Sequence, residues 1–128
     1  MNDTPSAPPL DSAALARLHD LDPDGRYAVV ARVLAAFDKS LTRMLARLAG
    51  EGGGESAAEI NKTETIADMA HTLKSSSASV GASALARACA EIEARQRVGD
   101  TAALHADTAR LVAEAAAAQL AVRAILQP

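Results

Sequence analysis

The amino-acid sequence predicts an all-α fold, an antiparallel up-down four-helix bundle with a short extra helix at its N-terminal end. Hydrophobic residues make up 49% of the 128 residues and aromatic residues only 2%, with alanine filling much of the difference. Alanine favours helices more than any other residue, whereas sheets favour branched and aromatic residues. In addition, apolar residues recur three and four positions apart in four long segments with short connections, which is typical of a helical bundle.

The N-terminal end of the chain differs in composition from the rest. Residues 1–10 are rich in Pro, Ser and Ala, and they lack the basic start and apolar stretch of a signal peptide. We expect them to form a disordered tail or the remnant of an interdomain linker. Residues 11–128 are then expected to form one domain, because a chain of this size fits a single domain with its own core.

Two helices are predicted in the first half of this domain. A short one covers Ser12–His19, with Leu15 and Leu18 facing inward. The second begins at Asp22-Pro23, because an acidic N-cap followed by proline is typical of a helix start. The glycine-rich residues 50–55 end it and form a surface loop. Its apolar residues, spaced three and four apart, are Val30, Val33, Leu34, Phe37, Leu41, Met44, Leu45 and Leu48.

Three further helices are predicted in the second half. The segment Ser56–Glu59 has the spacing of a capping box and opens the first of them, unless the start falls one turn later. This helix runs to about Val80, and the next covers Ala82–Val98. Gly99-Asp100 then combines a helix stop with the N-cap of the last helix. The inward-facing residues of these last two helices are Leu85, Cys89 and Ile92, followed by Leu104, Thr108, Leu111, Ala115, Ala118, Val122 and Ile125.

Charge and pattern exclude several classes of partner. The net charge is −3, and no cluster of Lys and Arg is long enough to follow a phosphate backbone, so we expect no nucleic acid. No apolar run reaches the roughly 18 residues of a membrane span, so we expect no membrane insertion. The single cysteine cannot form an internal disulfide, which fits a cytoplasmic location. Polar outer faces are expected on the helices, and they favour a monomer.

The sequence offers no convincing metal site, and we expect the chain to bind no metal. Neither His19 nor His105 has a second His, Cys or carboxylate at i+4 in a ligand arrangement. The Glu-x-x-His motif of di-metal bundles is absent. Both histidines are therefore expected on the surface, and Cys89 is expected to be a small buried hydrophobe. A solvated face of the Ala82–Val98 helix is expected to hold Glu93, Arg95 and Arg97.

The segment Ala70–Ala82 carries most of the functional information. Wound as a helix, it places His71 opposite its buried stripe, with Lys74 three residues on and Ser75 one turn along. An exposed imidazole with a cation beside it, and only small residues around it, suits a nucleophile that meets another macromolecule. The structural alternative for the serines is that Ser77 bonds back to a carbonyl one turn earlier and lets a neighbouring helix approach. The buried stripe consists of Ile66, Met69, Ala70, Leu73, Ser77 and Val80.

The same winding predicts a docking surface around His71. Four residues lie on the His71 side of the helix and are candidates for contacting a partner: Asp68, Ser75, Ala78 and Ser79. The following helix is expected to add Arg87 and Glu91 from its adjoining face.

The stretch Ala70–Glu93 resembles the histidine-containing phosphotransfer (HPt) domain family. The family pattern is a histidine, a lysine three positions on, three small residues, Gly-Ala, a leucine and a hydrophobic-Glu pair. The corresponding residues here are His71, Lys74, Ser75-Ser76-Ser77, Gly81-Ala82, Leu85 and Ile92-Glu93. The family usually has glycine where this chain has Ser75, and we expect the serine to be tolerated with slower or more selective transfer.

The resemblance implies a phosphorelay intermediate in two-component signal transduction. His71 would accept a phosphoryl group from an aspartyl phosphate of a receiver domain and pass it to another receiver. Lys74 would neutralise the phosphate charge, and Mg²⁺ would be bound by the receiver and not by this chain. The implied partners are response-regulator receiver domains and a hybrid sensor histidine kinase. The chain carries no ATP-binding signature, so we expect a phosphocarrier and no kinase activity of its own.

Two other interpretations stay open. The chain could be a helical adaptor that binds a receiver or kinase domain without carrying phosphate. It could also be a structural bundle with an incidental match. His71 together with Lys74 favours the phosphocarrier, because an adaptor needs neither residue.

Overall fold

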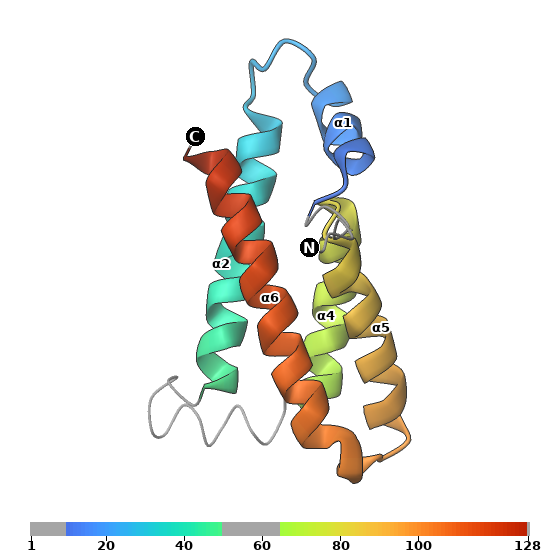
Figure 1. The fold of residues 1–128 in the computed structure, drawn as a ribbon. Helices are drawn as coiled ribbons and strands as arrows, with labels where there is room; N and C mark the ends of the chain where they lie inside the picture. The colour runs from blue at the N-terminus through green and yellow to red at the C-terminus, as the bar shows by residue number, and fades with distance from the viewer. Residues whose placement is uncertain (1–9, 50–64, 128) are drawn as a thin grey trace, which may run out of the picture.

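The computed structural model describes residues 10–49 and 65–127, and this part of the chain contains helices and no strands (Figure 1). The all-α prediction is therefore confirmed. None of the described helices is both long and apolar enough to cross a membrane. The helices are α1 Ser12–Asp20, α2 Val29–Leu48, α4 Ile66–Ser79, α5 Ser83–Arg97 and α6 Leu104–Leu126, with a 3₁₀ turn, η1, over Thr101–Ala103.

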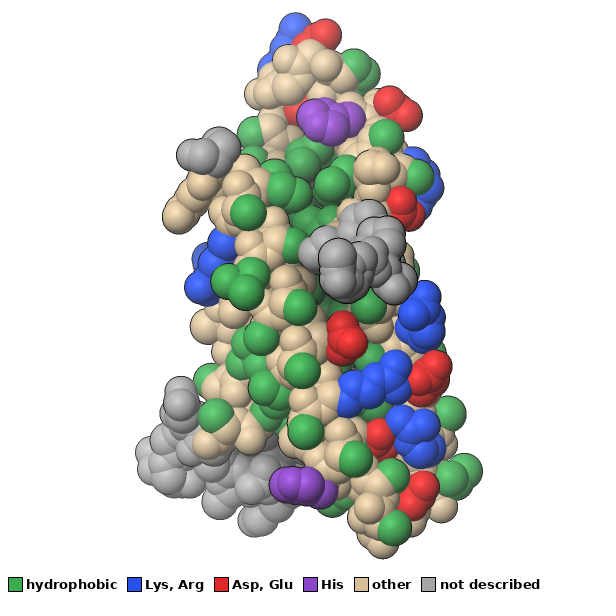
Figure 2. All heavy atoms as spheres, in the orientation of Figure 1, with side chains coloured by type: hydrophobic (Ala, Val, Ile, Leu, Met, Phe, Trp, Pro, Cys, Tyr) green, Lys and Arg blue, Asp and Glu red, His purple; other side chains and the backbone are tan. Residues whose placement is uncertain are grey.

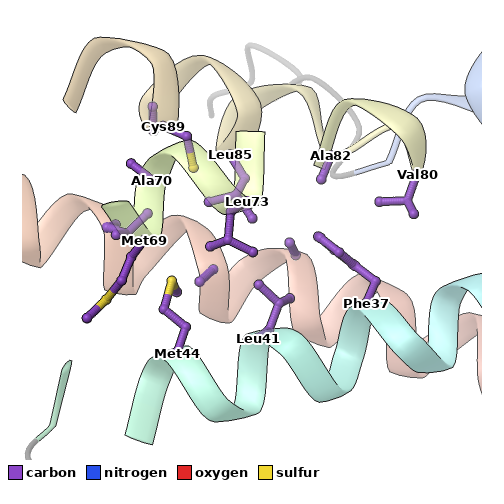
Figure 3. Close-up of a cluster of buried hydrophobic side chains, with 14 of the residues drawn as sticks. Phe37, Leu41, Met44, Met69, Ala70, Leu73, Val80, Ala82, Leu85 and Cys89 are labelled. Atoms are coloured by element: carbon purple, nitrogen blue, oxygen red, sulfur yellow. The ribbon is translucent and has the colours of Figure 1, made fainter. Parts of the chain in front are cut away.

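The four long helices form the predicted up-down bundle. Successive helices run in opposite directions, and α1 lies across the end of the bundle at which α4 turns into α5 (Figure 1). Helix α4 packs most extensively against α5, α5 also contacts α6, and α6 contacts α2. The core lies between them, where apolar side chains of α2, α4 and α5 point toward one another (Figure 3). Its largest fully buried side chains include Leu34, Leu41, Leu85, Ile92 and Leu111.

Leu10 and Asp11, at the start of the described residues, are anchored more firmly than the sequence predicted. Leu10 was expected in the tail, but it is only 8% exposed and belongs to the core. The side chain of Asp11 caps α1 by accepting from the Ala13 N–H at 3.0 Å. The Asp11 N–H donates to the carbonyl of Gly81 at 2.6 Å. This bond attaches α1 to the turn between α4 and α5.

The predicted start of the second helix at Asp22-Pro23 is wrong. Helix α2 begins at Val29, and Asp22 and Pro23 lie in a turn in which Gly25 N–H donates to the Asp22 carbonyl at 2.9 Å. Asp22 still caps the helix, but from a distance in sequence. Its carboxylate is buried and accepts from the Tyr27 and Val29 N–H groups at 2.9 and 3.2 Å. The sequence correctly indicated that Asp22 is a helix cap. The chain between Asp22 and Val29 has to fold back before the carboxylate can accept these hydrogen bonds.

Helix α4 begins with a reciprocal cap. Thr65 accepts from the Asp68 N–H, and the Asp68 carboxylate accepts from the Thr65 N–H, both at 3.2 Å. The helix start predicted at Ser56–Glu59 lies outside the described residues. The back-bond considered for Ser77 as a structural alternative is not formed, because its hydroxyl is buried and has no hydrogen-bond partner among the described residues. The serine that bonds back is Ser76, which donates to the Leu73 carbonyl at 3.2 Å.

The stop predicted at Gly99 is confirmed, but the predicted cap is wrong in part, because Asp100 caps the turn η1 and the last helix, α6, begins only at Leu104 with no side-chain cap. Gly99 has a φ of 80°, and the Asp100 carboxylate accepts from the Ala103 N–H at 3.2 Å. The predicted inner seam of α6 is correct in its middle, where Leu111, Ala115, Ala118 and Val122 are buried, but Leu104 and Ile125 at its ends are more than 40% exposed. A straight helix drifts away from a strict heptad seam, which explains the exposed ends.

Arg95 does not lie on a freely solvated face. Its guanidinium donates three hydrogen bonds to the Asp107 carboxylate on α6, the shortest of them 2.6 Å, and Gln96 adds another at 3.0 Å. Asp107 itself is only 3% exposed. The hydrogen bonds from Arg95 are the main reason that the pKa of Asp107 is lowered. This pair fixes α5 against α6.

The outer face of α6 also departs from expectation. Leu120 is 72% exposed and Val112 is 37% exposed, and Ala113, Ala116 and Ala117 between them face solvent as well. The charged residues of α6 instead reach toward its neighbours, with Arg110 on Glu91 and Arg123 on Asp38. Figure 2 accordingly shows hydrophobic side chains along much of α6. The polar outer face on which the monomer prediction depended is absent from this helix.

Gly81 provides a test of how α1 is attached. Its φ is 84°, and a Cβ there would lie 2.7 Å from the Asp11 nitrogen and 2.8 Å from the Asp11 oxygen. We expect Gly81→Ala to lower the free energy of unfolding by about 2 kcal/mol or more, since strain and a backbone clash combine. Gly99→Ala is the matched control, because Gly99 has a φ of 80° but no atom within 4 Å of the added Cβ. It should lower the free energy by about 1 kcal/mol. Equal losses in urea unfolding would contradict the proposed contact.

Candidate functional site

The candidate site is centred on His71, on the outward side of α4. The six residues predicted to form the buried stripe of this helix are all buried. His71 lies opposite them, and its side chain is 63% exposed. A partner can therefore reach the imidazole without any change in the bundle.

A carboxylate from the neighbouring helix joins His71 to Lys74. The Glu93 side chain of α5 has one oxygen, Oε2, 2.8 Å from His71 Nδ1 and the other, Oε1, 2.9 Å from Lys74 Nζ. Glu93 is only 16% exposed, whereas the Lys74 side chain is 41% exposed. The hydrogen bond from Lys74 is the main reason that the pKa of Glu93 is lowered, and the bond to His71 acts in the same direction. Glu93 is therefore an ionised acceptor at neutral pH.

This contact determines which imidazole nitrogen is available for chemistry. An ionised carboxylate can only accept hydrogen bonds, so His71 Nδ1 must be the donor and carry the ring proton. In a neutral imidazole the lone pair then belongs to Nε2. Because Nδ1 is occupied by Glu93, Nε2 is the nitrogen left for a nucleophilic role.

Two further charged residues extend the cluster. Arg97 lies one turn beyond Glu93 on α5, with its guanidinium 3.8 Å from Glu93 Oε2 and 3.2 Å from Asp68 Oδ1. Asp68 belongs to the first turn of α4, and its bond to the Thr65 N–H is the main reason that its pKa is lowered. Asp68, predicted on the His71 side of α4, is thus connected to His71 through Arg97 and Glu93.

Glu93 and Arg97 were assigned to a solvated face, and that assignment is wrong for Glu93, whose side chain is only 16% exposed, whereas the Arg97 side chain is 50% exposed. The turn between α4 and α5 contains Gly81 and Ala82, and the helices are antiparallel (Figure 1). Residues at equal distances from such a turn lie at the same height, and His71 and Glu93 are equally far from Ala82. This symmetry was available in the sequence and could have placed Glu93 at the height of His71, but not the rotation of α5 that turns its side chain to the imidazole.

The small residues predicted around His71 form an open surface. Ser75, Ala78 and Ser79 are all exposed and continue from His71 toward the C-terminal end of α4. There they meet a groove that α1 helps to form, which the sequence analysis did not anticipate. Its lining residues are Ala14, Arg17, Leu18, Leu21, Ala78 and Ser79.

The structure does not bring the two docking candidates of α5 together with His71. Glu91 turns toward α6, where its carboxylate pairs with Arg110 at 2.6 Å. The hydrogen bond from Arg110 is the main reason that the pKa of Glu91 is lowered, and Arg87 has a smaller effect in the same direction. Arg87 precedes Glu91 by one turn and therefore shares its side of the helix. The α5 residues that reach His71 are Glu93 and Arg97.

The remaining candidates lie where the sequence placed them. Cys89 is fully buried in the core, and burial raises the pKa of its thiol to about 11. His19 and His105 are exposed. Within residues 10–49 and 65–127 there is no group of three or more His, Cys, Asp or Glu residues that could hold a metal ion.

An exposed histidine on a four-helix bundle, with one ring nitrogen held by a carboxylate, defines a class of helical bundles with a solvent-accessible imidazole. Comparison with protein families agrees with this class. The family model of the Hpt domain matches residues 28–124, which include α2, α4, α5 and most of α6. The chain therefore belongs to the Hpt domain family, and phosphorelay signalling is the process in which it takes part. None of the curated proteins and none of the solved structures compared with the chain matches it.

Proposed function

We propose that this chain is a phosphorelay intermediate that carries a phosphoryl group on His71 Nε2. The observation that carries the proposal is the hydrogen bond between Nδ1 and Glu93, which leaves Nε2 as the exposed nucleophile of an Hpt bundle. The group would come from the aspartyl phosphate of one receiver domain and go to the aspartate of another. A hybrid sensor histidine kinase and a response regulator are the proposed sources of these receivers.

The transfer requires little of this chain beyond position and charge. The Nε2 lone pair attacks the phosphorus of the aspartyl phosphate, an N–P bond forms, and the P–O bond to the aspartyl carboxyl breaks. The electron pair of that bond stays on the aspartate, which leaves as a carboxylate. Phosphoryl transfer depends mainly on positioning and charge neutralisation, and a Mg²⁺ ion on the receiver would supply part of that charge. Each step can run in reverse, as a relay needs.

Lys74 is the proposed cation of this chain. Its Nζ is held by Glu93 in the unmodified protein and lies one helical turn from His71. Because its side chain is 41% exposed, it has room to turn from Glu93 toward a phosphoryl group on Nε2. An ammonium bonded to a phosphoryl oxygen forms a charge-assisted hydrogen bond.

Members of the Hpt family are phosphocarriers and not kinases, so we propose that this chain does not phosphorylate itself from ATP. The cytoplasm is the proposed compartment, because receiver partners and the single unpaired cysteine both fit it. The alternative function is an adaptor that binds a receiver through the same α4 surface without accepting phosphate. The first experiment separates the two.

Incubation with a phosphorylated receiver domain and Mg²⁺ should label the parent protein with an acid-labile, base-stable phosphoryl group. His71→Gln should carry no label, because the amide lacks a nucleophilic lone pair. Retained label on His71→Gln would move the acceptor to His19 or His105. Binding of the receiver without label on either protein would favour the adaptor.

Replacing Lys74 should slow transfer more than it weakens docking. We expect Lys74→Ala to lower the transfer rate constant by about 10- to 100-fold, the equivalent of one hydrogen bond to a charged group. The Kd for the receiver should change less than the rate. Lys39→Ala, which removes an exposed lysine of α2, is the control and should transfer at the parental rate. A parental rate for Lys74→Ala would remove Lys74 from the proposal.

The docking surface can be tested with a bulky charge. Ser75 is exposed and lies one turn from His71, so Ser75→Arg should obstruct a receiver and weaken its binding by about tenfold or more. Ala113→Arg places the same side chain on the exposed face of α6 and should leave the Kd unchanged. Titration of each variant with the receiver measures the two Kd values. Equal affinities would place the docking surface elsewhere on the bundle.

A further inference from the structure

Each oxygen of the Glu93 carboxylate binds a different donor, one the His71 ring and the other the Lys74 ammonium. Oε2 is 2.8 Å from the His71 ring, and Oε1 is 2.9 Å from Lys74. Lys74 can therefore leave for a phosphoryl group while the bond from Nδ1 to Oε2 stays in place. When Lys74 leaves, Glu93 loses one of its positive neighbours, and its negative charge acts more strongly on the ring.

The proton on Nδ1 determines how well a phosphorylated imidazole can give up its phosphoryl group. With Nε2 bonded to phosphorus and Nδ1 protonated, the ring is a cation. Cleavage of the N–P bond then returns the electron pair to Nε2 and releases a neutral imidazole. If Nδ1 has lost its proton, the same cleavage must release an imidazolate anion, which is a far poorer leaving group. Transfer is therefore fast only while Nδ1 keeps its proton.

We propose that Glu93 keeps Nδ1 of His71 protonated while the phosphoryl group is on Nε2, and so keeps phosphohistidine competent as a donor. This inference rests on the proposed function. On loading, the ring becomes a cation next to a carboxylate; on unloading, it becomes neutral with the same proton in place. No proton enters or leaves the site in either direction. Glu93 does not touch the phosphoryl group and is a positioning residue.

The other charges near His71 do not replace Glu93. Asp68, the second carboxylate of the cluster, is held by Arg97 at 3.2 Å and by the Thr65 N–H. Arg97 approaches Glu93 Oε2 only to 3.8 Å, so it leaves that oxygen to the ring. On the α2 side, Arg43 and Arg47 line a groove beside Thr72.

The buried Cys89 thiol, which also interacts electrostatically with Glu93 and Lys74, is neutral because its pKa is raised to about 11. Glu93 is thus the carboxylate that faces Nδ1. An opposite charge within hydrogen-bond distance favours the charged form of a group, which gives the sign of the effect.

The test compares the parent with Glu93→Gln after chemical loading with phosphoramidate, which needs no receiver. Nitrogen-15 NMR of the labelled His71 ring, assigned with His71→Gln, reports the pH at which Nδ1 loses its proton. We expect this midpoint to fall by about one pH unit in Glu93→Gln. Transfer to a receiver should then be about tenfold slower than in the parent above both midpoints, and nearly equal to it below both.

Two variants control for structure and for charge. Glu114→Gln makes the same change on α6, away from His71, and should leave the midpoint and the pH profile as in the parent. Glu93→Asp keeps the charge on a shorter side chain and should recover part of the midpoint, which a purely structural role would not predict. Thermal unfolding checks that each variant is folded.

Equal midpoints and equal pH profiles in the parent and Glu93→Gln would overturn the inference. A profile displaced by the same amount in Glu114→Gln would also overturn it, because the effect would then come from net charge. If a phosphorylated receiver fails to label His71, the proposed function fails instead. The NMR midpoint of the chemically loaded protein would still decide the role of Glu93.

Discussion

The packing of α4 against α5 is the contact on which the candidate site depends. Gly81 turns the chain between the two helices with a φ of 84°, and the helices then pack more extensively than any other described pair. Their antiparallel arrangement brings Glu93 to His71 across 22 positions of the chain. The same turn receives the Asp11 N–H and so places α1 beside the docking surface. The candidate site, the position of α1 and the groove beside it all depend on this one helical hairpin.

The charged cluster at the site matters for chemistry more than for stability. Exposed ion pairs contribute little to the free energy of unfolding, because water screens them and ordering long side chains costs entropy. The His71 side chain is 63% exposed and that of Lys74 is 41% exposed. What the cluster provides is a defined proton on Nδ1, a lone pair on Nε2 and a cation within one turn. Stability comes from the apolar core beneath it and from the Arg95–Asp107 pair.

Membership of the Hpt family explains why the site is so simple. A phosphocarrier has to hold a nucleophile still, keep it accessible and let the group leave again. The bundle holds α4 in place through its buried stripe, and the small exposed residues Ser75, Ala78 and Ser79 keep the approach open. In the proposed relay the His71 ring first accepts the phosphoryl group and later donates it, and Glu93 has to support the ring in both states.

The sequence by itself determined the helices, their order and the exposure of His71 beside Lys74, because these follow from periodicity within single helices. It also identified Asp22 as a helix cap, but it did not show that α2 begins at Val29. The hydrogen bond from the Val29 N–H to the Asp22 carboxylate forms only when the loop between them folds back. The tertiary structure decided that Glu93 faces His71, whereas Glu91 faces α6. The rotation of α5 about its axis is set by packing against two helices at once, and no pattern within α5 records it.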